Sequence, residues 1–385
     1  MVGGTVCLER FPSLFANRTG WSSSDAHMHV FFESDGRPFV LDSQMKWNAE
    51  VNAFLARLTV ISGRTNSPRT WRGYAYEFAD WLSYCARIGV DWNRVTELDL
   101  ATYRNILASE PSVRTGAPLR RGTINHRLGV ITQFYRFALK KSWVSALPFD
   151  VEEIRIPHGA SRGLSAPHKA CVAGASLRLR DLKEELEIPS RQDIRRFIKS
   201  FSAWRDRLMA EVMWLTGMRS AEVCALPMHA LPENPGSIGR ETAVIKITGK
   251  GQKRRAVLFP VRLLCSIERY VHMERRQIIR SGTPSSVFVG RGGKALQTSA
   301  VNRVFSTNCK RTGLSIWPHL LRHAHAVERL AYLQEIGAPN PLKTVQLELG
   351  HAHMATTERY LHLTERMRTD VIEAHNSFVD RLLGE

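Results

Sequence analysis

The sequence lacks the features of a membrane protein and of a disulfide-bonded one. No apolar run approaches the roughly 20 residues that a helix needs to cross a bilayer, and no basic-then-apolar signal pattern opens the chain. Its six cysteines lie far apart, without a CxxC pair or a Cys/His cluster at zinc spacing. We therefore predict a cytoplasmic protein with reduced thiols and no zinc site.

Acidic residues are also scarce relative to basic ones. The 385 residues include 54 Lys and Arg against 36 Asp and Glu, a formal net charge of +18, while the hydrophobic share is an ordinary 43%. A basic excess spread along a folded chain favours a polyanionic partner, because each neutralised phosphate releases a condensed counterion. Charge alone leaves open a cationic protein without a nucleic-acid role.

Helical periodicity begins only after an irregular start. Residues 1–44 show no period and are interrupted by glycine and proline, so we expect an irregular or partly ordered N-terminal extension of unknown role. Between residues 45 and 145, apolar residues recur at helical spacing and predict four helices, near 47–58, 71–82, 99–109 and 123–140. The basic residues of this segment cluster at helix starts and loops, where they can contact phosphates.

A long connector, residues 146–187, separates this helical domain from a second one at 188–385. The connector is positively charged and interrupted by proline and glycine. Ser190 is a plausible N-cap for the first helix of the second domain. Two short β-rich runs, 242–248 and 254–259, flank a glycine-containing turn and predict a hairpin. The predicted fold class is therefore mainly α with a small β-hairpin.

Two motifs of the second domain carry residues suited to binding phosphate. In TGMRSAE, residues 216–222, Arg219 begins a helix and Glu222 follows one turn later, able to orient the guanidinium. A planar guanidinium matches two phosphate oxygens, although a simple surface ion pair has the same pattern. In the hairpin turn, Lys250 can reach a ligand and donate a proton, and Lys253 competes for that role.

Two further motifs place histidines near a second arginine and a tyrosine. In HLLRHAHA, His319 and Arg322 lie one helical turn apart and can face one site. Gly350 frees the backbone to bring His351 close to a ligand, and Tyr360 follows nine positions later. A phenol, with a reference pKa of about 10, needs positive charge and a base nearby to act as a nucleophile. Taken singly, each residue is equally consistent with a structural role.

In their order, these motifs resemble the active site of the tyrosine recombinases, or phage integrases, especially the bacterial Xer-like branch. The matching segments are TGMRSAE, GKGQKRR, HLLRHAHA and LGHAHMATTERYLH. The resemblance, over residues 45–385, implies a two-domain, C-shaped clamp around duplex DNA. Residues 45–145 would be its helical core-binding domain, 146–187 a basic linker, and 188–385 a mixed α/β catalytic domain.

The resemblance also implies a role for each matching residue. Tyr360 would attack the scissile phosphate, leaving a 3′-phosphotyrosine and a free 5′-hydroxyl. Arg219 and Arg322 would bind the phosphate oxygens, and Lys250 would protonate the departing 5′ oxygen. The phosphotyrosine conserves the energy of the broken bond, so we expect neither a metal nor a cofactor.

Three supporting positions complete the implied site. His319 would assist proton transfer at Tyr360, His351 would hydrogen-bond the phosphate, and Glu222 would orient the site from behind. Arg322 and His351 lie 29 positions apart, more than the family pattern leads us to expect, with an insertion at residues 337–341 that could shift His351.

A last helix is predicted after Tyr360 from an apolar stripe between Met367 and Leu382. In this family such a segment often docks on a neighbouring subunit, so we expect a homotetramer on paired recombination sites. The sequence leaves open whether an accessory protein or partner recombinase takes part. Because residues 1–44 and the linker exceed the compact form, we predict integration, excision or transposition of a mobile element. The alternatives are a non-cleaving DNA-binding regulator of this fold and a nicking-closing enzyme like the type IB topoisomerases.

Overall fold

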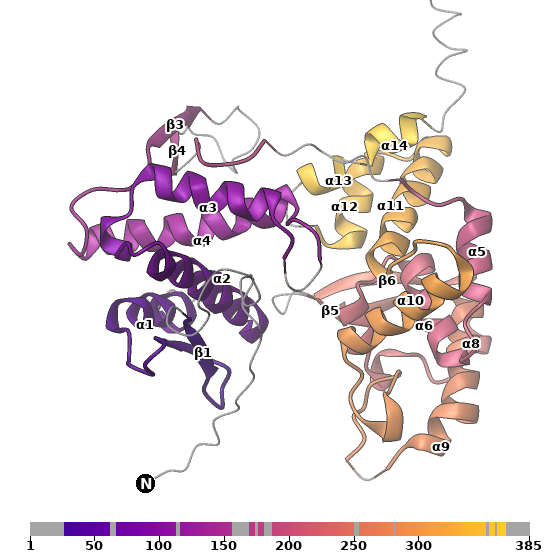
Figure 1. The fold of residues 1–385 in the computed structure, drawn as a ribbon. Coiled ribbons are helices and arrows are strands. Elements are labelled where there is room, and N and C mark those ends of the chain that lie inside the picture. The colour runs from indigo at the N-terminus through magenta and orange to yellow at the C-terminus, as the bar shows by residue number, and fades with distance from the viewer. Residues whose placement is uncertain are drawn as a thin grey trace, which may run out of the picture. The chain divides into compact units, whose positions relative to one another are not determined.

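The protein consists of two compact units, Met1–Glu184 and Glu185–Glu385 (Figure 1). The computed structural model describes residues 27–61, 67–112, 116–155, 169–173, 176–180, 187–249, 254–280, 282–351, 354–358 and 360–366. Helices dominate both units, and the strands form three separate two-stranded antiparallel sheets. The predicted fold class is confirmed. In the part described, no helix is both long and apolar enough to cross a bilayer.

The four predicted helices of the first unit surround one apolar core. They are α1 (Ala49–Ala56), continued by the π-helical η1 (Arg57–Ile61), α2 (Pro68–Arg87), α3 (Glu97–Ser109) and α4 (Arg121–Lys140), with the short η2 (Trp92–Arg94) between α2 and α3. The apolar positions that recur in the sequence meet here, with the rings of Phe78 and Phe134 only 4.4 Å apart. A capping box between Thr96 and Asp99 begins α3.

Residues 29–41 form regular structure within the predicted N-terminal extension. Strands β1 (His29–Phe32) and β2 (Pro38–Leu41) pair as an antiparallel hairpin. Val40 is buried in the helical core, and its backbone N–H and carbonyl are both hydrogen-bonded to the Asn52 side chain of α1 at 2.8 Å. Strands of four residues are too short to show a clear period, which explains why the sequence pattern missed them. Residues 1–26 lie outside the described part.

The connector predicted at 146–187 contains a second hairpin, β3 (Val151–Arg155) with β4 (Lys169–Ala173). Farther along, residues 176–180 lie against the helices of the first unit. Asn125 of α4 exchanges two hydrogen bonds of 2.9 Å with the backbone of Leu179, and Arg104 of α3 donates to the carbonyl of Leu177. The end of the connector is therefore anchored on the helices before the second unit begins.

The second unit contains the predicted hairpin and a set of helices. Its strands β5 (Thr242–Thr248) and β6 (Arg254–Pro260) pair with Ile245 opposite Val257. Ser190 caps the first helix by accepting the N–H of Asp193 at 3.0 Å. The helices are α5 (Arg191–Lys199), α6 (Trp204–Thr216), α7 (Ser220–Cys224), η3 (Met228–Ala230), η4 (Pro235–Ser237), α8 (Val261–Tyr270), η6 (Val271–Arg275), α9 (Arg276–Ile278), η7 (Arg291–Gly293), α10 (Thr298–Thr312), α11 (Pro318–Glu335), α12 (Pro341–Leu349), α13 (Ala355–Glu358) and α14 (Leu361–Arg366).

Helix α11 is the centre of this unit. It carries His319 and Arg322 and packs against α6, α12 and α14, which border the segments with Arg219, His351 and Tyr360 (Figure 1). The hairpin turn at 250–253 and the segment from 367 onward fall outside the described residues. The predicted terminal helix, and Lys250 with Lys253, therefore stay predictions.

Candidate active site

A sharp backbone turn places Arg219 at the start of α7. Helix α6 ends at Gly217, whose φ of +66° lies in the left-handed region. A Cβ atom at this position would come within 2.6 Å of the ring of His325, so a larger residue fits neither the conformation nor the space. The turn therefore brings Arg219 out of the core at the helix N-terminus.

Glu222 fixes the guanidinium of Arg219. The Oε2 atom of Glu222 accepts the backbone N–H of Arg219 at 2.8 Å, and Oε1 accepts Nη1 at 2.9 Å. A second arginine, Arg255 at the start of β6, donates Nη2 to Glu222 at 2.7 Å. Burial raises the pKa of Glu222, but the charge of Arg255 and the hydrogen bonds outweigh it, so the pKa lies below the usual value. The carboxylate is ionised at neutral pH.

Arg322 lies deeper, with 1% of its surface exposed. One terminal nitrogen donates to the carbonyl of Gly217 and the other to that of Leu349, the latter at 2.6 Å. Within the described part, its Nε has no hydrogen-bond partner. Burial, and then the charges of Arg219 and Arg255, lower the pKa of Arg322 to about 9. Three guanidiniums facing the single carboxylate of Glu222 form a site that favours an anion.

His351 reaches this cluster despite the insertion before it. The extra residues form the turn between α11 and α12, where Asn340 has a φ of 52°. Helix α12 ends at Gly350, with a φ of +66°, and the Nδ1 of His351 lies 2.9 Å from the Thr357 hydroxyl. Burial, then Arg322 and Arg219, lower the pKa of His351 to about 4. Its imidazole is therefore neutral at pH 7.

Tyr360 is buried beside a histidine that the sequence analysis did not single out. Its hydroxyl lies 2.7 Å from Nδ1 of His323, and only 1% of its surface is exposed. The ring of His351 stacks at 6.3 Å, and the rings of His323 and His319 meet edge to face at 4.4 Å. His323 lies four residues after His319 on α11, and this helical spacing is the signal that could have identified it.

The structure brings together five of the predicted site residues and adds two. The five are Arg219, Glu222, Arg322, His351 and Tyr360, and the additions are His323 and Arg255. His319 is exposed and meets the cluster through the ring of His323. Arg255 lies in the GKGQKRR motif, two residues beyond Lys253, but its partner cannot be read from the motif.

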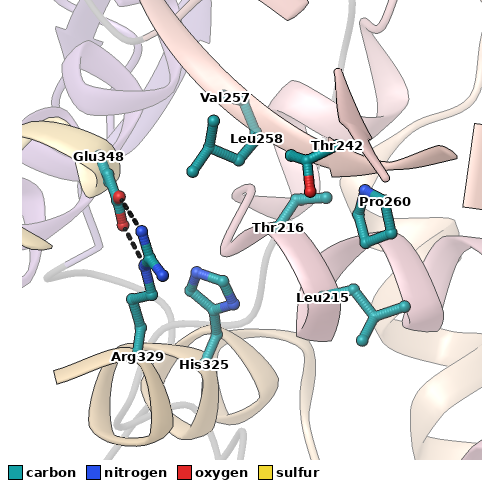
Figure 2. Close-up of a pocket in the computed structure, with 9 residues that line it drawn as sticks. All are labelled: Leu215, Thr216, Thr242, Val257, Leu258, Pro260, His325, Arg329 and Glu348. Atoms are coloured by element: carbon teal, nitrogen blue, oxygen red, sulfur yellow. Dashed lines mark hydrogen bonds and ion pairs between the residues drawn. The ribbon is translucent and has the colours of Figure 1, made fainter. Parts of the chain in front are cut away.

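A cavity of about 170 Å³ lies in the same unit, lined by residues of α6, α11, α12 and the β5–β6 hairpin (Figure 2). Figure 2 shows Arg329 and Glu348 paired at its edge, by hydrogen bonds of 3.0 and 2.8 Å, next to His325 on the same helix as Arg329. The other lining residues are Leu215, Thr216, Thr242, Val257, Leu258 and Pro260. None of the predicted site residues lines the cavity. The cavity therefore lies among residues that pack the unit together and not in the candidate active site.

Acid is expected to destabilise the packing around this cavity through His325. Its Nδ1 lies 2.8 Å from the carbonyl of Trp214, and burial lowers the pKa of His325 to about 4. Between pH 6.5 and about 4 the unfolded chain binds this proton more readily than the native state, so stability falls as the pH drops. We expect the free energy of unfolding to fall by about 1 kcal/mol more in wild type than in His325→Asn between pH 7 and 5, after discounting for partial exposure.

Urea unfolding of both proteins at the two pH values measures this difference. The His325→Asn variant keeps a side-chain amide near the position of Nδ1, so the hydrogen bond to Trp214 can be retained. The exposed His272, changed to Asn, is the matched control and should behave as wild type. Equal losses of stability in wild type and His325→Asn would show that His325 is not the group responsible.

Comparison with known proteins gives a consistent set of matches. The model of the phage integrase family matches residues 190–367. Tyrosine recombinase XerC of Leptospira interrogans is 24% identical over 80% of this chain and 88% of its own length. XerC of Chlamydia muridarum is 29% identical over 66% of this chain and 71% of its own.

Solved structures agree in fold. XerH bound to a palindromic difH substrate aligns with a TM-score of 0.54 and 19% identity, over 86% of this chain and 84% of XerH. A lambda integrase dimer bound to a core site aligns with a TM-score of 0.55 and 14% identity, over 80% and 94% of the two chains. At these identities the likeness concerns the fold.

Proposed function

Because this chain belongs to the phage integrase family of tyrosine recombinases and is a site-specific recombinase, we propose that it cleaves DNA through a 3′-phosphotyrosine at Tyr360. One observation carries the proposal. The Tyr360 hydroxyl contacts a histidine, His323, within a site where three guanidiniums face one carboxylate. This arrangement supplies a nucleophile, a proton acceptor and a binding site for a phosphate anion.

Arg219 binds the non-bridging oxygens of the scissile phosphate. The side chain of Arg219 is 30% exposed, and its Nη2, with a long contact of 3.5 Å to the Gly350 carbonyl, is available to a ligand while Glu222 holds Nη1. Arg322 contributes charge from beneath. Burial and the charges of Arg219 and Arg255 lower the pKa of Arg322, and a bound phosphate would offset the repulsion among the three arginines.

His351 acts as a neutral hydrogen-bond donor to the same phosphate. Its Nδ1 is occupied by the Thr357 hydroxyl. When this hydroxyl donates to Nδ1, the proton of the neutral imidazole is on Nε2, which can then donate to the phosphate. A neutral donor stabilises the charge that develops on the phosphorane and adds no further repulsion to the arginines.

The proton of Tyr360 passes to Nδ1 of His323 as the phenolic oxygen forms its bond to phosphorus. The bond from phosphorus to the 5′ oxygen breaks, and Lys250 supplies the proton that this oxygen gains. His319, whose ring meets that of His323 at 4.4 Å, is the next group able to exchange the proton with solvent. In this scheme His319 assists proton transfer from one step farther away.

Replacing His323 by alanine is expected to slow strand cleavage about 10²-fold at pH 7, a typical contribution of a general base. The deficit should shrink as the pH approaches the phenol pKa, because hydroxide then removes the proton instead. Single-turnover cleavage measured from pH 6 to 10 gives both quantities.

Two variants control this measurement. His272→Ala, at an exposed position of the same unit, should cleave as wild type does. His319→Ala is the second control. If it slows cleavage more than His323→Ala does, and with a stronger pH dependence, the proton of Tyr360 goes to His319, and His323 only holds the Tyr360 hydroxyl in place. A wild-type rate in His323→Ala would remove it from the proton transfer altogether.

The finer proposal is that a homotetramer on paired sites integrates, excises or transposes a mobile element. Duplex DNA is the partner that a net charge of +18 favours. Two solved relatives in fold support the proposal: a lambda integrase tetramer bound to a Holliday junction, with a TM-score of 0.51 at 14% identity, and the Tn1549 transposon integrase with circular intermediate DNA, with 0.53 at 14%. The hairpin β1–β2 and the long connector extend the compact two-domain form.

The proposed function is tested by isolating the protein from its host under denaturing conditions, without cross-linker, and sequencing any DNA still attached. A covalent adduct survives this treatment, and a shared sequence among the attached DNA identifies the site. If neither this isolation nor a nicked-substrate trap yields an adduct while duplex binding persists, the protein is a non-cleaving DNA-binding regulator. Relaxation of a supercoiled circle without a partner site would instead indicate a nicking-closing enzyme.

A further inference from the structure

Arg255 joins three segments of the active site with one side chain. We infer that it is a positioning residue, which sets the phosphate-binding orientation of Arg219 through Glu222 and holds the β5–β6 hairpin against the turn before His351. The inference rests on the proposed function, since it assigns a task within that site. Arg255 itself does not touch the phosphate in this assignment.

The first contact is with Glu222. The Nη2 atom of Arg255 donates to Oε2 at 2.7 Å, and the same Oε2 accepts the backbone N–H of Arg219. Oε1 remains for the Arg219 guanidinium. With both oxygens occupied, the carboxylate cannot rotate without losing a charge-assisted hydrogen bond, and Arg219 is held in one orientation.

The second contact is with the end of α12. The other terminal nitrogen of Arg255 donates to the carbonyl of Glu348, two residues before Gly350. A Cβ atom at position 350 would lie 2.8 Å from Cδ of Arg255, so the arginine stem passes directly over the glycine. His351 follows this turn. The position of His351 relative to Arg219 therefore depends on a side chain from β6.

The third segment is the hairpin itself. Arg255 is the second residue of β6, five positions after Lys250. Arg255 anchors the start of β6 on both Glu222 and Glu348. Groups that support a site keep its reactive side chains in place, so this anchor is expected to matter for Lys250 as well.

Exposure distinguishes the task of Arg255 from that of Arg219. Its side chain is 9% exposed against 30% for Arg219, and both of its terminal nitrogens are engaged within the protein. A lysine offers a single terminal nitrogen and cannot replace a two-pronged guanidinium. Arg255 therefore has the geometry of a brace between two segments.

The experiment compares single-turnover cleavage by wild type, Arg255→Ala, Arg219→Ala and the double variant. The substrate is a saturating nicked duplex of the sequence recovered with the protein. We expect Arg255→Ala to cleave about 10–100-fold more slowly, the usual effect of removing a group that orients a site, with its Kd for the duplex within about threefold. The double variant should be no slower than Arg219→Ala, because both changes remove one function.

A second substrate separates positioning from a general packing defect. It carries an uncharged methylphosphonate at the scissile position, which reduces the need for arginine charge. If Arg255 acts through Arg219, the deficits of both single variants shrink together on this substrate. A packing defect would slow cleavage of both substrates equally and overturn the inference.

Controls make the remaining outcomes decisive. Arg254→Ala changes the exposed neighbour on the same strand and should cleave at the wild-type rate on saturating DNA. Arg255→Lys keeps the charge and most of the stem, and is used if the alanine variant does not fold; it too should be slow. A wild-type rate for either Arg255 variant, or additive losses with Arg219→Ala, would contradict the inference alone. If wild type forms no adduct, the proposed function fails and the inference with it.

Discussion

Replacing Tyr360 with phenylalanine is expected to abolish the covalent protein–DNA adduct, with a loss of cleavage on the order of 10⁴-fold or more, as for removal of a catalytic nucleophile. The change deletes a single oxygen from a side chain that is 1% exposed, so the ring keeps its packing. The hydrogen bond to His323 is lost, at a cost of about 1 kcal/mol in stability. Duplex binding should stay within about threefold of wild type, since the phosphate contacts provide most of the affinity.

The measurement is adduct formation on a nicked duplex, resolved by denaturing gel, beside a binding assay on the same DNA. Tyr332→Phe is the matched control, because this tyrosine lies on the exposed side of α11 in the same unit and should form adducts as wild type does. An adduct formed by Tyr360→Phe would show that another residue is the nucleophile. Loss of duplex binding together with cleavage would point instead to a folding defect.

Arg219→Ala is expected to reduce cleavage by about 10²–10³-fold at saturating DNA, the range found when one preorganised donor to a developing charge is removed. The fold should survive, because Glu222 keeps its hydrogen bond with Arg255 and so remains paired. The slope of log binding constant against log salt should fall by about 1, as expected when one phosphate contact is lost.

Arg219→Lys separates charge from geometry at this position. A lysine restores the positive charge, but its ammonium group is a point charge and cannot contact two phosphate oxygens as the planar guanidinium does. Most of the loss should therefore persist. Arg254→Ala, changed at an exposed position, is expected to affect binding and its salt dependence without slowing cleavage of bound DNA. Cleavage by Arg219→Ala within tenfold of wild type would exclude Arg219 from the phosphate site.

Periodicity predicted the long elements well. Helices α2 and α4 have apolar residues at helical spacing over 20 residues each, and the β5–β6 hairpin has paired β-rich runs around a glycine turn. It failed at β1 and β2, where strands of four residues leave too few positions to establish a period. Their formation depends on Val40 and Asn52, which meet only when the hairpin lies against α1.

The sequence alone established the order and chemical type of five site residues, because local motifs with fixed spacing carry them. These residues are Arg219, Glu222, Arg322, His351 and Tyr360. Only the tertiary structure decided which groups touch. It paired Tyr360 with His323, 37 residues away, and Glu222 with Arg255, 33 residues away. Spacing within a helix specifies the face on which a side chain lies. The packing of α11 against α14, and of β6 against α6 and α12, selects the partner that the face meets.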